Sequence, residues 1–184
     1  MEIVFPALVN PNLAQQTWEF LMLQQFIKGK KLLEIGSRHG ESLLRFALTM
    51  GEGSTVVSLD NNVEEGLGHL YFNALFLRRH TVELINGDSH DPGIVEKIKS
   101  YGHFDFVFVD GDHSEEGVTK DYENYFPLCN VMAFHDILLD TVERFWSKHK
   151  RDHPMMEIVH PSCHGAMGIG VLFNDNYLHT WGNQ

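Results

Sequence analysis

From residue 31 onward, the chain alternates short runs of apolar or β-branched residues with longer stretches in which apolar positions recur at helical spacing. The short runs predict strands over residues 31–35, 55–59, 81–85, 104–109, 131–134, 156–159 and 168–173. The longer stretches predict helices over residues 41–50, 67–79, 92–100, 115–125 and 138–150. This alternation predicts an α/β fold with a doubly wound, mostly parallel seven-stranded sheet and helices on both faces.

The two ends of the chain depart from this alternation. No crossover helix fits between residues 159 and 168, so the last two strands are predicted to form an antiparallel pair at the sheet edge. A first helix is predicted from Asn12 to Lys28, and it could cover either the ligand site or the sheet edge. We expect residues 1–184 to form one domain, with residues 1–29 as a helical extension.

Composition narrows the range of partners. The formal net charge of −11 argues against nucleic acid or an anionic membrane surface as the main partner, because both require a basic face. Cys129 and Cys163 have no metal-type spacing and are typical of reduced thiols in a cytoplasmic protein. Residues 1–6 do not look like a signal peptide, and no apolar run reaches transmembrane length. We therefore expect neither a nucleic-acid nor a membrane partner.

Polar residues gather where the predicted strands end. The first strand is followed by Gly36 to Gly40, and the next four strands are followed by Asp60, by Asp88, by Asp110 with Asp112, and by His135 with Asp136. In a doubly wound sheet the carboxyl ends of the parallel strands share one rim, where ligands bind. Acidic residues after four consecutive strands therefore predict a ligand site on that rim.

The first two of these segments indicate a nucleoside-bearing cofactor. Gly36 would let the backbone turn sharply, and the helix that follows Gly40 would offer free N–H groups to a ligand. Asp60 stands where a carboxylate accepts hydrogen bonds from ribose hydroxyls. NAD would favour a three-glycine fingerprint, whereas S-adenosylmethionine (SAM) has no pyrophosphate and does not need one.

These segments resemble a known family. The series Leu33-Glu34-Ile35-Gly36-x-x-x-Gly40, Val57-x-Leu59-Asp60 and Gly87-Asp88-Ser89 is similar to the SAM-binding series of class I methyltransferases. Residues 104–114, with Gly117-Val118-x-x-Asp121 and Ala133-Phe134-His135-Asp136, resemble more specifically a branch that contains small-molecule and sugar O-methyltransferases and cephalosporin-hydroxylase-like proteins. The resemblance covers roughly residues 30–175 and implies a Rossmann-like methyltransferase fold.

The resemblance also implies roles for individual residues in binding SAM. Glu34, Gly36 and Ser37 would face its methionine part, and Asp60 its ribose. Asp88 and Ser89 would face its adenine. Gly40, which ends the glycine loop, and Asp110 complete the implied cofactor-binding set.

In metal-dependent members of the family, an acid after the fourth strand and two residues after the fifth hold a divalent cation. The resemblance maps these positions to Asp110, His135 and Asp136. The usual pair after the fifth strand is acidic or amide, so His135 departs from the pattern. Magnesium prefers oxygen ligands, whereas imidazole suits manganese, iron or zinc better, which leaves the metal open.

Methyl transfer needs an oxygen nucleophile. A cation on the substrate hydroxyl would lower its pKa, and a nearby carboxylate could take the proton. Asp112 is the first candidate for this general base and His113 the second. If the extended backbone continues past the fourth strand, Asp110 and Asp112 point to the same side and His113 points away. Gly111 could instead permit a turn there, which would reverse the order of the two candidates.

Two other functions remain open. Asp110-Gly111-Asp112 is also a D-x-D sequence, as in glycosyltransferases that bind a metal and a nucleotide sugar. A non-catalytic SAM-binding module would carry the same cofactor residues without turnover. For the methyltransferase we expect a small-molecule acceptor, and a substrate lid could come from residues 1–28, from residues 160–168 or from a second subunit in a homodimer.

Overall fold

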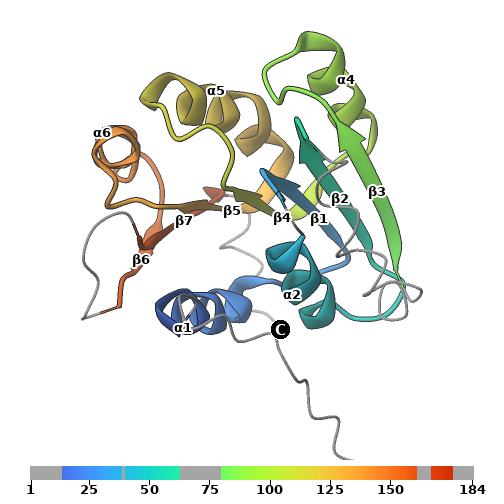
Figure 1. Cartoon of the computed structure of the whole chain (residues 1–184), viewed down its shortest axis with the longest axis horizontal. Helices are drawn as coiled ribbons and strands as arrows, with labels where there is room; N and C mark the ends of the chain where they lie inside the picture. The colour runs from blue at the N-terminus through green and yellow to red at the C-terminus, as the bar shows by residue number, and fades with distance from the viewer. Residues whose placement is uncertain (1–13, 39, 63–79, 161–166, 176–184) are drawn as a thin grey trace, which may run out of the picture.

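The computed structural model describes residues 14–38, 40–62, 80–160 and 167–175, and its centre is a seven-stranded sheet (Figure 1). The strands are β1 (Lys31–Ile35), β2 (Thr55–Asp60), β3 (Thr81–Asn86), β4 (Phe104–Val109), β5 (Cys129–His135), β6 (Met155–Ile158) and β7 (Ile169–Phe173). Their order across the sheet is β3-β2-β1-β4-β5-β7-β6. The predicted doubly wound sheet is confirmed, because the strand order reverses at β1 and β4.

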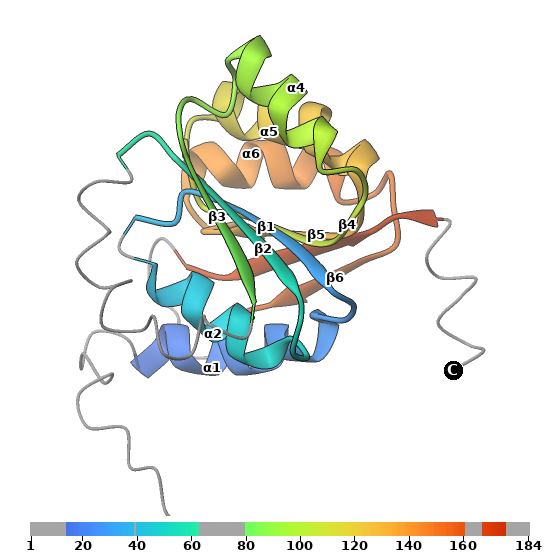
Figure 2. The ribbon, with the colours of Figure 1, turned by 90° about the vertical axis from the view of Figure 1, so that its right-hand side faces the viewer.

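Helices cover both faces of the sheet. The helices are α1 (Ala14–Leu23), α2 (Glu41–Thr49), α4 (Pro92–Ser100), α5 (Glu115–Tyr125) and α6 (Asp140–His149). Figure 2 shows α4, α5 and α6 on one side of the sheet and α1 and α2 on the other. The helix predicted over residues 67–79 lies outside the described residues. Within the described part of the chain, no helix combines the length and the apolar character needed to cross a membrane.

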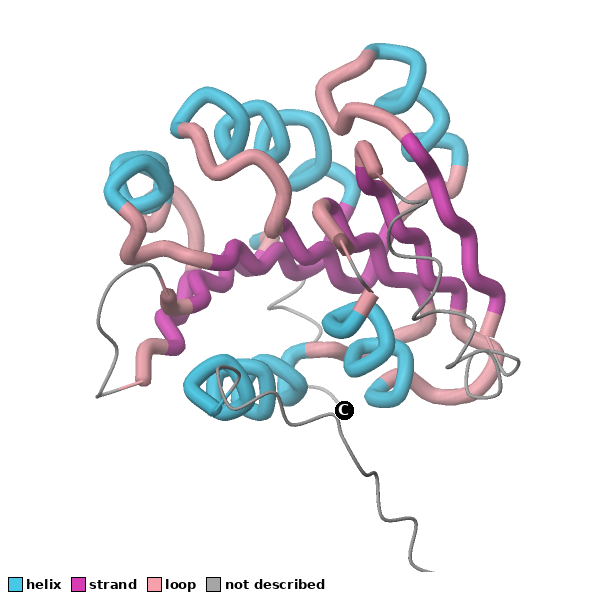
Figure 3. Tube along the Cα trace, in the orientation of Figure 1, coloured by secondary structure: helices cyan, strands magenta, loops and turns pink. Residues whose placement is uncertain are grey.

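The strands after β5 run as predicted. Figure 3 shows the strands of the sheet in magenta, with helices in cyan on either side. β7 pairs antiparallel with β5 on one side and with β6 on the other, whereas β1 to β5 pair only in parallel. The boundary of β5 differs from the prediction, because Cys129 already pairs with Phe104 and the strand therefore begins two residues earlier.

Two helices begin where the sequence predicts because of polar caps. The Asp91 side chain accepts hydrogen bonds from the backbone N–H groups of Gly93 and Ile94, and Pro92 occupies the first turn of α4. The Ser114 side chain likewise accepts from the Gly117 N–H at the start of α5. The second cap fixes the chain just after the loop that follows β4, which carries several of the candidate site residues.

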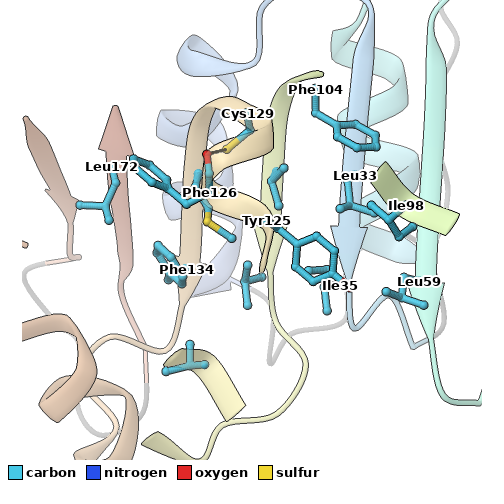
Figure 4. Packing of buried hydrophobic residues seen from close by; sticks show 14 of the residues in the cluster. Leu33, Ile35, Leu59, Ile98, Phe104, Tyr125, Phe126, Cys129, Phe134 and Leu172 are labelled. Atoms are coloured by element: carbon cyan, nitrogen blue, oxygen red, sulfur yellow. Dashed lines mark hydrogen bonds between the residues drawn. The ribbon is translucent and has the colours of Figure 1, made fainter. Parts of the chain in front are cut away.

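The central strands are buried on both faces, as parallel strands between two helical layers must be. In β4, Val107 and Val109 join the hydrophobic cluster beneath α4, α5 and α6. Phe106 and Phe108 point to the opposite face and join the cluster beneath α1 and α2. Figure 4 shows the first cluster, in which several packed side chains are labelled: Leu33, Ile35, Leu59, Ile98, Phe104, Tyr125, Phe126, Cys129, Phe134 and Leu172.

The N-terminal helix covers the sheet face beside the edge strand β6. Phe20 of α1 packs against Phe46 and Phe108, with ring centroids 5.6 Å apart in both pairs. Glu19 is fully buried and accepts hydrogen bonds of 3.4 Å from the backbone N–H groups of His160 and Gly168. These contacts join α1 to the segments that flank β7. The predicted end of this helix at Lys28 is wrong, since α1 ends at Leu23, a short 3-10 turn follows to Phe26, and Ile27 is already extended.

Candidate active site

A cavity of about 800 Å³ opens at the carboxyl ends of the parallel strands. Its lining residues come from the loops after β1, β2, β3, β4 and β5: Ile35, Gly36, Arg38, Leu59, Asp60, Asn61, Asn62, Gly87, Asp88, Ser89, His90, Asp110, Gly111, Asp112, His113, His135 and Asp136. Most of the residues predicted from the sequence are therefore brought to one cavity. Glu34, Ser37 and Gly40 are the predicted residues that do not line it.

The loop after β1 is packed tightly against the loop after β4. Gly36 has a φ of +83°, and its N–H donates a 2.8 Å hydrogen bond to the carbonyl of Leu59. A Cβ atom at this position would collide with the backbone of Asp110 and Gly111. Glycine alone tolerates both the positive φ and the lack of space for a Cβ atom. Gly36 therefore lets the chain turn and lets the loop after β1 contact the loop after β4.

Ser37 and Glu34 lie behind the cavity wall. The Ser37 hydroxyl is buried and lies 2.6 Å from the Ser58 hydroxyl. Glu34 is fully buried, and burial raises its pKa to about 8. The Ser42 hydroxyl opposes this rise in part, and the charges of Asp110 and Asp60 add to it. The Glu34 side chain does not line the cavity, so it can influence a ligand only through the residues of the cavity wall.

The carboxylates after β2 and β3 organise their own loops. Asp60 accepts a 2.7 Å hydrogen bond from the Arg38 N–H through Oδ2 and a 2.8 Å bond from the Asn62 N–H through Oδ1. Asp88 accepts a 2.8 Å bond from the His90 N–H and has a side chain that is 67% exposed. Each carboxylate has acceptor capacity left, because its two oxygens can take about four hydrogen bonds.

The loops after β4 and β5 bring four side chains together. One ligand atom from each of Asp110, His113, His135 and Asp136 lies within 4.8 Å of the others. Asp110 Oδ1 is 3.2 Å from His113 Nε2 and 3.2 Å from His135 Nδ1. The chain turns at Asp136, which has a φ of +58°, and both of its oxygens face the two imidazoles. We call these four residues the Asp–His cluster.

Charge pairing dominates the electrostatics of the Asp–His cluster. Asp110 and Asp136 raise the pKa of His113 to about 10. Burial lowers the pKa of His135, but the same two carboxylates overcome it and raise that pKa to about 10. Burial raises the pKa of each carboxyl group, whereas the two imidazoles outweigh it and hold both pKa values below the ordinary range. The carboxylates therefore stay ionised and face positive charge.

His135 shows that the Asp–His cluster fits a cation. Its side chain is only 6% exposed, and among the described residues neither of its ring nitrogens has a hydrogen-bond partner. Nδ1 lies 3.2 and 3.3 Å from carboxylate oxygens, at angles that do not suit an N–H donor. Buried polar atoms without partners are costly, and imidazole with carboxylate is a common donor set for divalent metals. The predicted residues Asp110, His135 and Asp136 thus meet, and His113 joins them.

The predicted geometry of Asp112 and His113 is wrong. The strand ends at Val109, and the chain turns at the following residues, so the extended backbone does not continue. His113 consequently points to Asp110, with 3.2 Å between Nε2 and Oδ1. Asp112 is turned toward the start of α5, where its Oδ1 accepts a 2.8 Å hydrogen bond from the Ser114 N–H and its carboxylate sits against Gly117.

A family model described as "Methyltransferase domain" matches residues 33–137 of the chain. The chain belongs to the methyltransferase domain family. This match begins at Leu33 within β1 and ends at Ile137 just after β5, and it thus includes all the loops that line the cavity. The resemblance inferred from the sequence is confirmed, and the glycosyltransferase interpretation of Asp110-Gly111-Asp112 is not favoured.

Curated relatives of this methyltransferase domain include caffeoyl-CoA O-methyltransferase 1 of Zea mays, which is 34% identical over 127 residues. That alignment covers 66% of this chain and 42% of the relative. A second relative, described as a probable caffeoyl-CoA O-methyltransferase 3 of Dictyostelium discoideum, is 29% identical over 130 residues, which is 65% of this chain and 48% of the relative. The chain spans less than half the length of these two curated relatives.

Solved structures share the fold of this methyltransferase domain. An O-methyltransferase from Bacillus cereus in complex with SAH superposes with a TM-score of 0.66 at 18% identity, covering 90% of this chain and 82% of that one. The O-methyltransferase TomG from Streptomyces achromogenes, in complex with SAM, gives a TM-score of 0.66 at 17% identity, covering 88% and 80% of the two chains. These likenesses confirm the predicted Rossmann-like methyltransferase fold.

The sequence reasoning missed His90 and gave no role to Asp121, although Asp121 belongs to one of the motifs of the resemblance. His90 lines the cavity just after Asp88 and Ser89, and its Nε2 lies 3.2 Å from Oδ1 of the fully buried Asp121. Burial raises the pKa of Asp121 to about 6, opposed by Ser89 and His90. The position of His90 after β3 was a signal that could have identified it. Its pairing with a residue on α5 needed the structure.

Proposed function

We propose that this domain binds SAM and transfers the methyl group to a hydroxyl group of a small molecule. The observation that carries the proposal is the cavity of about 800 Å³, which is lined by the loops after all five parallel strands. The names of the relatives support it, since the curated ones are caffeoyl-CoA O-methyltransferases and two structural neighbours hold SAH or SAM. The cavity volume is also typical of a small-molecule site.

The loops after β1, β2 and β3 form the proposed cofactor half of the cavity. Asp60 is proposed to accept hydrogen bonds from the ribose hydroxyls, and Asp88 with Ser89 to bind the adenine. Gly36 and the backbone of Ser37, with the helix start at Gly40, would face the methionine part. Glu34, which lies behind this loop, would act on the methionine part only through the cavity wall.

The Asp–His cluster forms the proposed acceptor half. Asp110, His135 and Asp136 would hold a divalent cation, which would lower the pKa of a hydroxyl group bound to it. Asp110, which the resemblance also put in the cofactor-binding set, is assigned to the cation in this proposal because its Oδ1 faces the two imidazoles at 3.2 Å. The acceptor oxygen would then attack the methyl carbon while the bond between that carbon and sulfur breaks. The loops would supply the alignment, because an in-line displacement depends on placing the two reacting atoms close together.

Asp112 is the proposed acceptor of the hydroxyl proton. Asp112 lines the cavity, and the backbone N–H of Ser114 lowers the pKa of its carboxyl group, so it is ionised but weakly basic. Most of the activation must therefore come from the cation. His113 is a poorer candidate for the base, because its Nε2 already faces Asp110 at 3.2 Å and Asp136 at 3.1 Å.

Location and assembly complete the proposal. We propose a cytoplasmic protein, on the basis of two cysteines without disulfide or metal spacing, one of which, Cys129, is a buried free thiol. A second subunit in a homodimer could supply the substrate lid.

The test is turnover of SAM by tag-free protein. Protein, SAM and a divalent metal are incubated with a panel of acceptors, namely caffeoyl-CoA, a simple catechol and a rhamnose nucleotide, and S-adenosylhomocysteine formation is measured. We expect formation that depends on one class of acceptor. SAM binding without any such product would support the non-catalytic module instead. Binding of a UDP-sugar but not of SAM would contradict the proposal.

A further inference from the structure

The Asp–His cluster forms a ring in which oxygen and nitrogen donors alternate. Asp110 Oδ1 lies 3.2 Å from both His113 Nε2 and His135 Nδ1. Asp136 closes the ring, with Oδ2 at 3.1 Å from His113 Nε2 and Oδ1 at 3.3 Å from His135 Nδ1. The four oxygen–nitrogen pairs are thus separated by nearly equal distances, with Asp136 offering a different oxygen to each imidazole.

These separations are close to those around a bound metal ion. With metal–ligand bonds of about 2.1 Å, neighbouring donors lie about 3.4 Å apart in a tetrahedron and about 3.0 Å apart in an octahedron. The separations of 3.1 to 3.3 Å fall between these two values. One ligand atom from each residue also lies within 4.8 Å of the others, so side-chain shifts would let all four residues reach one ion.

His135 is fixed in place independently of any ion. Its ring stacks on Phe20 of α1, with centroids 6.1 Å apart and planes 27° apart, and Phe108 packs against it at 6.1 Å. The aromatic rings hold the imidazole without offering it a hydrogen-bond acceptor, and neither of its nitrogens has a hydrogen-bond partner within the described ranges. A buried imidazole that is held by packing and directed at two carboxylates is arranged as a ligand.

The type of donor then decides which ion fits. Mg²⁺ strongly prefers oxygen ligands and usually retains several waters, whereas imidazole suits Mn²⁺, Fe²⁺, Co²⁺, Ni²⁺ and Zn²⁺. We propose that Asp110, His113, His135 and Asp136 form a two-imidazole, two-carboxylate site that selects a first-row transition-metal dication over Mg²⁺. The inference rests on the proposed function, because it concerns the same cation site, and it adds His113 as a fourth ligand.

The test is a titration of tag-free, metal-free protein with Mg²⁺, Mn²⁺, Co²⁺ and Zn²⁺, followed by calorimetry and by the visible absorption of bound Co²⁺. We expect Co²⁺ and Zn²⁺ to bind at least about 100-fold more tightly than Mg²⁺. The affinity for Mn²⁺ should lie between that for Mg²⁺ and those for Co²⁺ and Zn²⁺. Equal or tighter binding of Mg²⁺ would overturn the proposal. Absence of binding by all four ions would also overturn it, since the Asp–His cluster would then be an ion-pair network only.

Variants locate the ion and assign the selectivity. His135→Asp should reduce the preference for Zn²⁺ over Mg²⁺ by at least about tenfold, because one imidazole becomes an oxygen donor. Since His135 is buried, His113→Gln at a partly exposed ligand provides a second test, with a similar weakening of Co²⁺ binding and a changed Co²⁺ spectrum. His103→Gln is the matched control, because His103 is exposed and bonds to Asn130 at the other end of β4. If both cluster variants bind Zn²⁺ as the control does, the ions bind elsewhere and the proposal fails.

A parallel SAM titration separates this inference from the proposed function. SAM binding and turnover without metal selectivity would overturn the inference alone. Metal selectivity without SAM binding would leave the cation site standing and overturn the proposed function.

Discussion

The two halves of the cavity use acidic residues in different ways. After β2 and β3, Asp60 and Asp88 accept hydrogen bonds from backbone N–H groups of their own loops. After β4 and β5, Asp110 and Asp136 instead face two imidazoles at 3.1 to 3.3 Å. In the first half the carboxylates shape loops and keep acceptor capacity for a neutral polar ligand, whereas in the second half they face positive charge.

Acidic residues that follow neighbouring parallel strands therefore need not have the same function. Carboxylates satisfied by backbone N–H groups suit ribose hydroxyls, which donate hydrogen bonds and carry no charge. Carboxylates that share a partly buried cluster need a cation, because close like charges are costly in a low dielectric. The predictions below test whether the two halves can be damaged separately.

The largest effect is expected in the acceptor half. Asp110→Ala should weaken divalent-metal binding by about 100- to 1000-fold, since a four-ligand metal site carries roughly 10–16 kcal/mol and one ligand supplies a substantial share. The metal affinity of this variant is measured by calorimetry. SAM affinity, measured on the same sample, should change by less than about threefold. An equal loss of both affinities would show that the halves are not separable.

The next effect concerns Glu34, which lies behind the wall that joins the halves. Its pKa is raised from 4.5 to about 8, so the folded protein holds a proton that the unfolded chain releases in this window. Its stabilising contribution is therefore complete below about pH 4.5 and is lost as the pH rises through about 8, at a cost on the order of a few kcal/mol. Urea unfolding of ligand-free protein over this pH range measures the loss.

Glu34→Gln should remove that dependence on pH, because the amide does not titrate. Glu41→Gln provides the matched control, since Glu41 is an exposed acid in the first turn of α2. The control should retain the pH dependence of the unmodified protein. If Glu34→Gln retains it as well, Glu34 does not carry the raised pKa.

A smaller effect is expected in the cofactor half. Asp60→Ala should weaken SAM binding about 10- to 100-fold, because the ribose hydroxyls lose a charged acceptor worth roughly 1.5–3 kcal/mol. Asp60→Asn keeps one acceptor oxygen and should lose less. Metal affinity should be unchanged in both variants. Calorimetry that finds unaltered SAM affinity in Asp60→Ala would remove Asp60 from the cofactor site.

The smallest effect is expected at Asp112. Asp112→Asn should lower the turnover number about tenfold, since its weakly basic carboxylate assists a proton transfer that the cation largely drives. SAM and metal affinities should stay within about twofold of the unmodified protein. The pH–rate profile of both variants on one acceptor shows whether Asp112 or His113 is the base. Loss of its basic limb in His113→Gln, with Asp112→Asn unaffected, would transfer the role of base to His113.

The fold could be predicted from the sequence because its signals are local. Apolar runs such as Phe104–Val109 identify strands, and caps such as Asp91 and Ser114 mark where helices begin. The shared rim followed from the alternation of strands and helices. β6 and β7 form an antiparallel pair at the sheet edge, with β7 next to β5. This pair was predicted because the segment between residues 159 and 168 is too short for a crossover helix.

The details of the site were less predictable because they depend on turns and on distant partners. The chain turns after Val109, which reverses the expected sides of Asp112 and His113. The contact between Gly36 and the backbone of Asp110 joins two loops far apart in the sequence. The pairing of His90 with Asp121 likewise spans two elements. Spacing along one strand carries no information on such contacts.

The central claim is that one cavity binds SAM through the cofactor half and independently of the acceptor half. The most direct measurement is calorimetric titration of tag-free protein with SAM, UDP-glucose and NAD, each with and without Zn²⁺ or Mg²⁺. We predict that SAM binds at one site per chain without added metal, while UDP-glucose and NAD give no binding heat. Binding of UDP-glucose or NAD with no binding of SAM would contradict the account.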